Sequence, residues 1–122
     1  MAAHEYLQGE QLSMFIPARE LMNYTAGETE NFSGDYMPLA QSPNVRSRKL
    51  RESKEYGGWG ANPRHQESLY DNIKKKGVSY PIELQLPRHN GLSPNTQIWD
   101  GNHRVVAAND IDPNMEVPVR YS

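Results

Sequence analysis

The stretch "IWDGNHRVVAAND", residues 98–110, says most about how this chain folds. We predict that a strand over residues 97–99 turns directly into a helix that begins at Asn102 or His103. Such a turn requires a residue that tolerates positive φ, and Gly101 supplies it. Ligand-binding loops often have this arrangement, and it is also a common plain connection between a strand and a helix.

Four consecutive residues of this turn are candidates for binding a phosphate or a carboxylate: Gly101, Asn102, His103 and Arg104. The N–H groups of a first helical turn have no partner within the helix, and this end of a helix favours negative charge. Arg104 adds a permanent charge with a planar fork of donors, and His103 can carry charge near neutral pH. The alternative is that Asp100 caps the helix, Gly101 only makes the turn and Arg104 pairs with a nearby acid.

The rest of the chain carries strand and helix patterns in mixed order, which predicts one α+β domain over residues 1–122. Further strands are expected over residues 12–16, 82–86 and 116–121. Further helices are expected from Ala18, over residues 45–56, and to residue 76 from an N-cap at Asn62. The helix that begins at Asn102 or His103 should end at Asn109.

Two segments depart from these regular patterns. Residues 25–44 are rich in Gly, Ser, Pro and acids and have no hydrophobic period, so we expect a long irregular loop there. Pro118 interrupts the last strand, which should therefore lie at the sheet edge or place this residue at a non-hydrogen-bonding position.

Composition limits the classes of protein to which the chain can belong. It has no Cys, which excludes disulfides, thiolate metal sites and cysteine nucleophiles. The four His lack the spacing of a metal pair, and no carboxylate cluster is spaced to hold two metals, so no metal site is predicted. No apolar run approaches the roughly 18 residues that span a bilayer, and the N-terminus has no signal-peptide pattern. We therefore expect a soluble, cytoplasmic protein that does not engage a membrane.

Charge is segregated along the chain, although the net charge is only −2. Residues 1–42 carry −5, residues 43–76 carry +5 and the remainder carries −2. The middle third would attract a phosphate-bearing partner, or else the acidic and basic segments face each other in the fold. The candidate nucleic-acid contacts are four neighbouring cations, which could equally form a solvated helix face: Arg46, Arg48, Lys49 and Arg51.

Two stretches together resemble the N-terminal domain of ParB-type partition proteins and their sulfiredoxin-like relatives: "NPRHQESLYDNIKKKGVSYPIEL" and "IWDGNHRVVAA". The shared features are a helix that ends in a Gly-Val step, a Pro-Ile step at a strand start, and a Gly-x-x-Arg helix N-terminus with small residues behind it. The resemblance is strongest over residues 62–110, and the Asp-Gly-x-His-Arg form is most similar to small ParB-like proteins of phages and mobile elements. It implies a small mixed sheet with helices packed on it, and it adds Arg64 as a ligand contact.

The chain departs from both well-known branches of this family. Sulfiredoxins use a Cys within Gly-Cys-His-Arg, where this chain has Asn102, so that reductase chemistry is excluded. Partition proteins that hydrolyse CTP carry Gly-Glu-Arg-Arg, and the replacement of two of these letters by Asn102 and His103 puts CTP hydrolysis in doubt. A helix-turn-helix segment does not follow, so operator binding by that route is not expected.

Two functions follow from these observations. In the first, the protein binds a nucleotide or nucleic-acid phosphate at residues 101–104 with help from Arg64, and His103 would serve as acid/base in any hydrolysis of a nucleotide or phosphodiester. In the second, it is a non-catalytic protein that binds a host protein, or another copy of itself, in the host cytoplasm if a phage encodes it. Trp59 would contact that partner or stack a base, or it pins its loop to the core.

Overall fold

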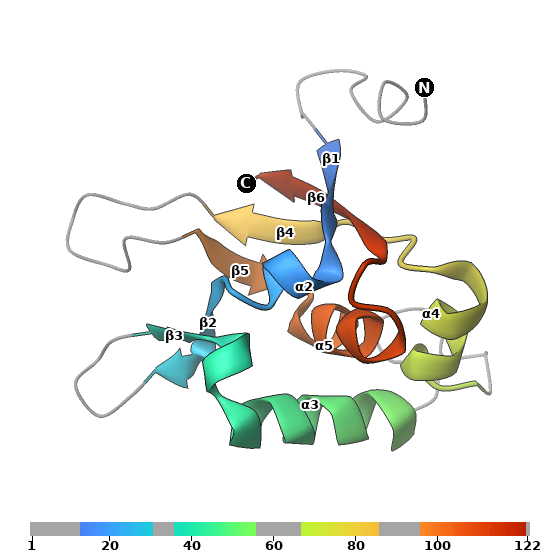
Figure 1. The fold of residues 1–122 in the computed structure, drawn as a ribbon, viewed down its shortest axis with the longest axis horizontal. Coiled ribbons are helices and arrows are strands. Elements are labelled where there is room, and N and C mark those ends of the chain that lie inside the picture. The colour runs from blue at the N-terminus through green and yellow to red at the C-terminus, as the bar shows by residue number, and fades with distance from the viewer. Residues whose placement is uncertain (1–12, 31–35, 56–66, 86–95, 122) are drawn as a thin grey trace.

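The structure of the chain, a computed structural model, describes residues 13–30, 36–55, 67–85 and 96–121 (Figure 1). Within these ranges the strands are β1 (Ser13–Pro17), β2 (Thr25–Glu30), β3 (Tyr36–Pro38), β4 (Ile82–Gln85), β5 (Gln97–Asp100) and β6 (Glu116–Tyr121). The helices are α2 (Ala18–Leu21), the 3-10 helix η1 (Leu39–Gln41), α3 (Pro43–Glu55), α4 (Leu69–Lys76) and α5 (Asn102–Ile111). The predicted α+β class is confirmed.

All six strands join one mixed sheet in the order β1-β6-β4-β5-β2-β3. The pairs β6–β4 and β5–β2 are parallel, and the other three pairs are antiparallel. Because β6 lies between β1 and β4, the first of the two positions predicted for Pro118, at the edge of the sheet, is wrong. Pro118 is buried and stands opposite Phe15 of β1.

The prediction of a long irregular loop over residues 25–44 is also wrong. Its described residues, 25–30 and 36–44, include β2, β3, η1 and the start of α3. Thr25 and Ala26 are almost fully buried and pair with Gln97 and Ile98 of β5. The ladder hydrogen bonds come from a strand about seventy residues further along the chain, so the local composition does not reveal this strand.

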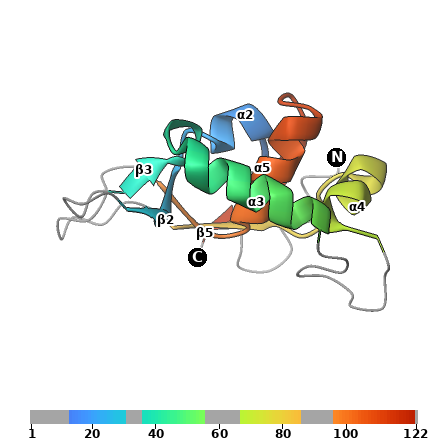
Figure 2. The ribbon, with the colours of Figure 1, turned by 90° about the horizontal axis from the view of Figure 1, so that it is seen from below.

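Helix α5 is the centre of the core. Val105, Val106, Ala107 and Ala108 are all at most 2% exposed, because α5 packs against α2, α3, α4 and β4. A helix surrounded in this way needs apolar residues on more than one face. In Figure 2 the helices α2, α3 and α5 lie on one side of β5.

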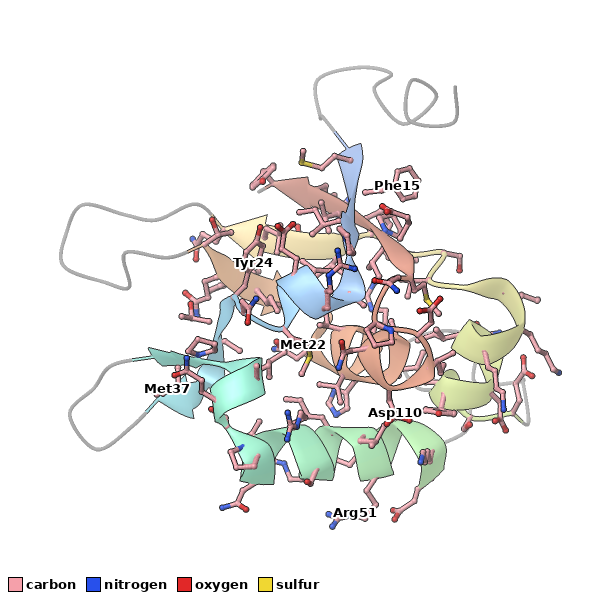
Figure 3. The ribbon with its side chains drawn as sticks, viewed as in Figure 1. Phe15, Met22, Tyr24, Met37, Arg51 and Asp110 are labelled. Atoms are coloured by element: carbon pink, nitrogen blue, oxygen red, sulfur yellow. The ribbon has the colours of Figure 1, made fainter. Side chains whose placement is uncertain are left out.

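Helices α3 and α4 pack around α5, and α4 begins later than its sequence suggests. Its N-cap is Ser68, whose hydroxyl accepts a 3.1 Å hydrogen bond from the N–H of Asp71. The prediction of an N-cap at Asn62 is therefore wrong, although Asn62 itself lies outside the described residues. A side chain from each helix completes the contact: the Tyr70 hydroxyl of α4 donates to Asp110 of α5 at 2.7 Å, and Lys54 of α3 lies over the Tyr70 ring. Asp110 is labelled in Figure 3.

Within the described ranges, no helix combines the length and the apolar character that a bilayer crossing requires.

Candidate functional site

The turn between β5 and α5 depends on Gly101. Its φ is +113°, as the sequence predicts for this position. A Cβ placed there would lie 2.6 Å from Ile82 Cδ1 and 3.1 Å from Arg104 Nη2. Glycine is therefore required both by the backbone conformation and by the close approach of β4.

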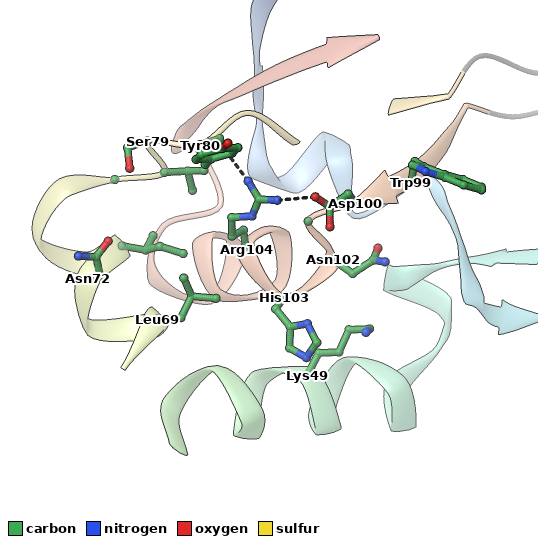
Figure 4. A pocket seen from close by; sticks show the side chains of 14 residues that line it. Lys49, Leu69, Asn72, Ser79, Tyr80, Trp99, Asp100, Asn102, His103 and Arg104 are labelled. Carbon is green, nitrogen blue, oxygen red and sulfur yellow. Dashed lines mark hydrogen bonds and ion pairs between the residues drawn. The ribbon is translucent and has the colours of Figure 1, made fainter. Parts of the chain in front are cut away.

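A pocket of about 490 Å³ opens beside this turn, and we call it the α5 pocket (Figure 4). Its walls come from α3, α4, the segment 77–80 and the segment 99–104. The first turn of α5 forms part of the wall, and no side chain among the described residues caps that turn. The first-turn N–H groups have no acceptor within the helix, so this wall favours an anion.

The strand β5 carries a bulge immediately before this turn. Glu83 of β4 stands opposite Asp100, whereas the next residue, Leu84, stands opposite Ile98. Trp99 is therefore the extra residue on β5. Bulges often re-aim side chains next to binding sites, and here the bulge lies on the pocket wall.

Arg104 is engaged by the protein itself. Its guanidinium donates to the main-chain carbonyls of Tyr80 at 2.6 Å and Pro81 at 3.1 Å, and it lies 3.3 Å from an Asp100 carboxylate oxygen. The side chain is only 16% exposed, and this burial lowers the pKa of Arg104, with Asp100 acting in the opposite direction. Asp100 therefore pairs with Arg104 and does not cap α5. The two carbonyl contacts of Arg104 hold the segment before β4 against the start of α5.

His103 connects α5 to α3. Its Nε2 lies 2.7 Å from a carboxylate oxygen of Glu52, and both side chains are partly buried. The hydrogen bond from His103 lowers the pKa of Glu52, although partial burial of the carboxylate acts in the opposite direction. Fifty-one positions separate the two residues, so the sequence carries no signal for this pair.

The four cations predicted to contact nucleic acid do not share one surface. Arg48 and Arg51 are exposed, and Arg51 pairs with Glu55 at 3.6 Å. Lys49 points inward, is 2% exposed and lines the α5 pocket. The helical period explains the difference, because Lys49 is four residues from both Val45 and Ser53 on the inner face of α3. In the sequence, that spacing indicates that Lys49 lies on the same face of the helix as Val45 and Ser53.

Three further residues of the pocket matter for a ligand. Tyr80 and Trp99 were not predicted as site residues, and Asn102 was predicted to bind only through its backbone N–H. Tyr80 and Trp99 line the pocket and are 68% and 61% exposed. Asn102 Oδ1 is buried and has no hydrogen-bond partner among the described residues. A buried acceptor without a partner costs roughly 1–3 kcal/mol, so Asn102 is a candidate to accept a hydrogen bond from a ligand.

Several sequence predictions concern residues for which the structure gives no account. Arg64 and Trp59 lie outside the described residues. Among those that are described, no group of three or more metal-ligating side chains is placed to hold an ion.

Comparisons of the chain with models of protein families, with curated proteins and with solved structures found no match.

Proposed function

We propose that this protein binds a phosphate-containing small molecule, a nucleotide, in the α5 pocket. The observation that carries the proposal is the pocket itself, whose wall includes the uncapped first turn of a ten-residue helix. Its volume falls within the range of about 300–1,000 Å³ that is usual for small-molecule sites. A pocket of this size accommodates a nucleotide, whereas a nucleic-acid duplex would meet only its rim.

The polar and aromatic residues of the pocket support the same ligand. The first turn of α5 and the two cations that line the pocket, Lys49 and Arg104, favour the phosphate. Tyr80 and Trp99 offer exposed rings against which a base can pack. Asn102 offers a buried acceptor for a ligand N–H or O–H group. Apolar walls with a few placed polar groups are typical of small-molecule sites.

The family is part of the proposal. The Gly-x-x-Arg helix N-terminus and the Pro-Ile strand start support membership of the ParB-like group, among small cytoplasmic proteins of phages or mobile elements. Any hydrolysis of a phosphate ester would use His103 as acid/base, with Glu52 orienting its ring. Release of inorganic phosphate from CTP or ATP, compared between wild type and His103→Gln, tests that activity.

Thermal denaturation with added ligands tests the binding proposal. Nucleoside monophosphates and triphosphates should be compared with inorganic phosphate, and at least one nucleotide should raise Tm because it binds only the folded state. Asn102→Asp should abolish the rise, because it places a carboxylate in the pocket wall. It should leave the fold intact, since an acid in the first turn of a helix is favourable.

Asn114→Asp is the matched control, because it adds the same charge at an exposed position outside the pocket. It should keep the Tm rise seen with wild type. A Tm that no nucleotide changes, or a rise that survives Asn102→Asp, would refute the proposal. Binding of a labelled oligonucleotide without a response to any nucleotide would favour a nucleic-acid surface instead.

A second candidate function is non-catalytic binding of a host protein. The observation that favours it is the exposure of Tyr80 and Trp99, since exposed aromatic residues are often central to interfaces. In this case nucleotides leave Tm unchanged, and Trp99→Ala releases a host protein that co-purifies with wild type.

A further inference from the structure

The α5 pocket has two exposed aromatic rings, and they are held differently. Tyr80 and Trp99 both line the pocket and are 68% and 61% exposed. Figure 4 shows them on opposite sides of the Arg104 and Asp100 side chains, so a single base packs against one of them. Which ring takes the base decides how a nucleotide lies in the pocket.

Arg104 holds the Tyr80 ring in position. Its guanidinium donates a 2.6 Å hydrogen bond to the Tyr80 main-chain carbonyl, and its Cζ lies 5.7 Å from the centroid of the Tyr80 ring. Pro81 follows directly and favours an extended backbone at Tyr80. The ring is therefore positioned before a ligand arrives, and a group already in place loses less conformational entropy on binding.

The contact with Arg104 leaves the Tyr80 ring available to a ligand. Cation–π contacts extend to about 6 Å from the ring centroid, so the 5.7 Å separation is near the outer limit. The residue also keeps 68% of its surface exposed. Arg104 therefore orients the ring without covering it.

Trp99 is presented differently. It is the extra residue of the bulge in β5, and in Figure 4 its ring points away from Arg104 and Tyr80. Among the described residues, no cation lies over the Trp99 ring. A base on Trp99 would therefore pack against a ring that Arg104 does not hold.

The separation between the first turn of α5 and the Tyr80 ring suits a nucleotide. Arg104 belongs to that first turn, and its side chain reaches from there to the ring. An arginine side chain is comparable in length to the sugar and 5′ carbon that separate the phosphate of a nucleotide from its base. A phosphate on the first-turn N–H groups therefore brings the base within reach of Tyr80.

We propose that the base of the nucleotide stacks on the Tyr80 ring, and that Arg104 is a positioning residue that holds this ring. The inference rests on the proposed function, and it assigns the base to Tyr80 and not to Trp99. Stacking uses the π face that every base has, so Tyr80 contributes affinity without selecting among the bases. A sugar phosphate without a base binds more weakly.

Isothermal titration with and without the base tests the inference. The tightest-binding nucleotide is compared with its base-free counterpart, which is ribose 5-phosphate for a monophosphate and inorganic tripolyphosphate for a triphosphate. The ratio of the base-free Kd to the nucleotide Kd measures the contribution of the base. In wild type this ratio should be about ten- to a hundredfold, as for one base stacked on an aromatic side chain.

Tyr80→Leu removes the ring and should reduce this ratio to less than about threefold, whereas Tyr80→Phe keeps the ring and should retain the ratio. Trp99→Leu is the matched control, because it removes the other exposed ring of the pocket and should change the ratio less than about twofold. Tyr80 is largely exposed, so its replacement should leave the fold intact, which circular dichroism checks.

Arg104→Met should also lower the ratio, because the Tyr80 ring then loses the group that holds it. A loss of phosphate affinity alone would raise both Kd values equally and leave the ratio unchanged. An unchanged ratio in Arg104→Met would therefore overturn the positioning role of Arg104.

The outcomes separate this inference from the proposed function. If wild type binds no nucleotide, the proposed function fails and this inference fails with it. If wild type binds a nucleotide and Tyr80→Leu keeps the wild-type ratio, only the assignment of the base to Tyr80 fails. That assignment also fails if Trp99→Leu lowers the ratio as much as Tyr80→Leu does.

Discussion

Arg104, on the first turn of α5, donates a 2.6 Å hydrogen bond to the main-chain carbonyl of Tyr80. Together with its bond to Pro81, this contact holds the segment before β4 against the helix that forms the pocket wall. Arg104, which the sequence predicts to bind the ligand, therefore stabilises the fold around the pocket.

Arg104→Met should destabilise the protein by roughly 2–3 kcal/mol, because it removes charged donors from two main-chain carbonyls, of which that of Pro81 is partly buried. Urea denaturation measures the change. Arg51→Met removes an exposed arginine paired with Glu55 and should cost less than about 0.5 kcal/mol. Equal losses in the two variants would show that the Tyr80 contact is not stabilising.

Gly101→Ala should destabilise the protein more than Gly77→Ala, by roughly 1–3 kcal/mol. Both glycines have positive φ, so both variants incur backbone strain. Only at Gly101 would the new Cβ also overlap a neighbour, Ile82 Cδ1 at 2.6 Å, whereas nothing lies within 4 Å at Gly77. Matched urea titrations give the difference, and equal losses would mean that β4 moves away freely.

The hydrogen bond between His103 and Glu52 should make stability depend on acid pH. The pKa of Glu52 in the folded protein lies below its ordinary value of 4.5, chiefly because His103 donates to it. Its contribution to stability is therefore present above about pH 4.5 and is lost as pH falls through the lower, folded pKa. The difference in unfolding free energy between wild type and Glu52→Gln should shrink over that interval.

Urea denaturation at a series of pH values from about 3 to 7 measures this difference. Glu55→Gln, on the exposed side of the same helix, accounts for the general effect of removing a carboxylate from α3. A difference between wild type and Glu52→Gln that stays constant across the series would contradict the pairing.

Ser68→Ala should cost about 1 kcal/mol, because the N–H of Asp71 loses its acceptor at the start of α4. Ser68→Asp should stay close to wild type, since aspartate caps helices as well as serine does. Chemical denaturation of the three proteins checks this N-cap. A loss in Ser68→Asp as large as that in Ser68→Ala would point to a role of the hydroxyl other than capping.

The local features of the fold could be predicted from the sequence. The alternation of Ile82 and Leu84 with polar residues marks β4, and the glycine at position 101 marks the turn into α5. Both signals lie within a few residues of the structure that they specify. The same holds for the burial of α5, whose small and branched apolar residues are consecutive.

The features that depend on distant partners could not be predicted. β2 is ordered by pairing with β5, and its own residues carry no strand period. The spacing of Lys49 from Val45 and Ser53 places the three residues on one face of α3, but the burial of that face depends on the packing of α3 against α5. The Glu52 contact of His103 likewise joins two helices that are far apart in the chain.

The position of β6 also determines when the sheet can form. β6 pairs with both β1 and β4, yet it follows both in the chain. During synthesis, β1 leaves the ribosome first and cannot join the sheet until residues 116–121 have been made. Until then, the main-chain groups of β1 and β4 that pair with β6 have no partner strand. Unpaired strand edges of this kind promote aggregation, and chaperones shield them. Completion of one late strand therefore joins the first strand to the rest of the sheet.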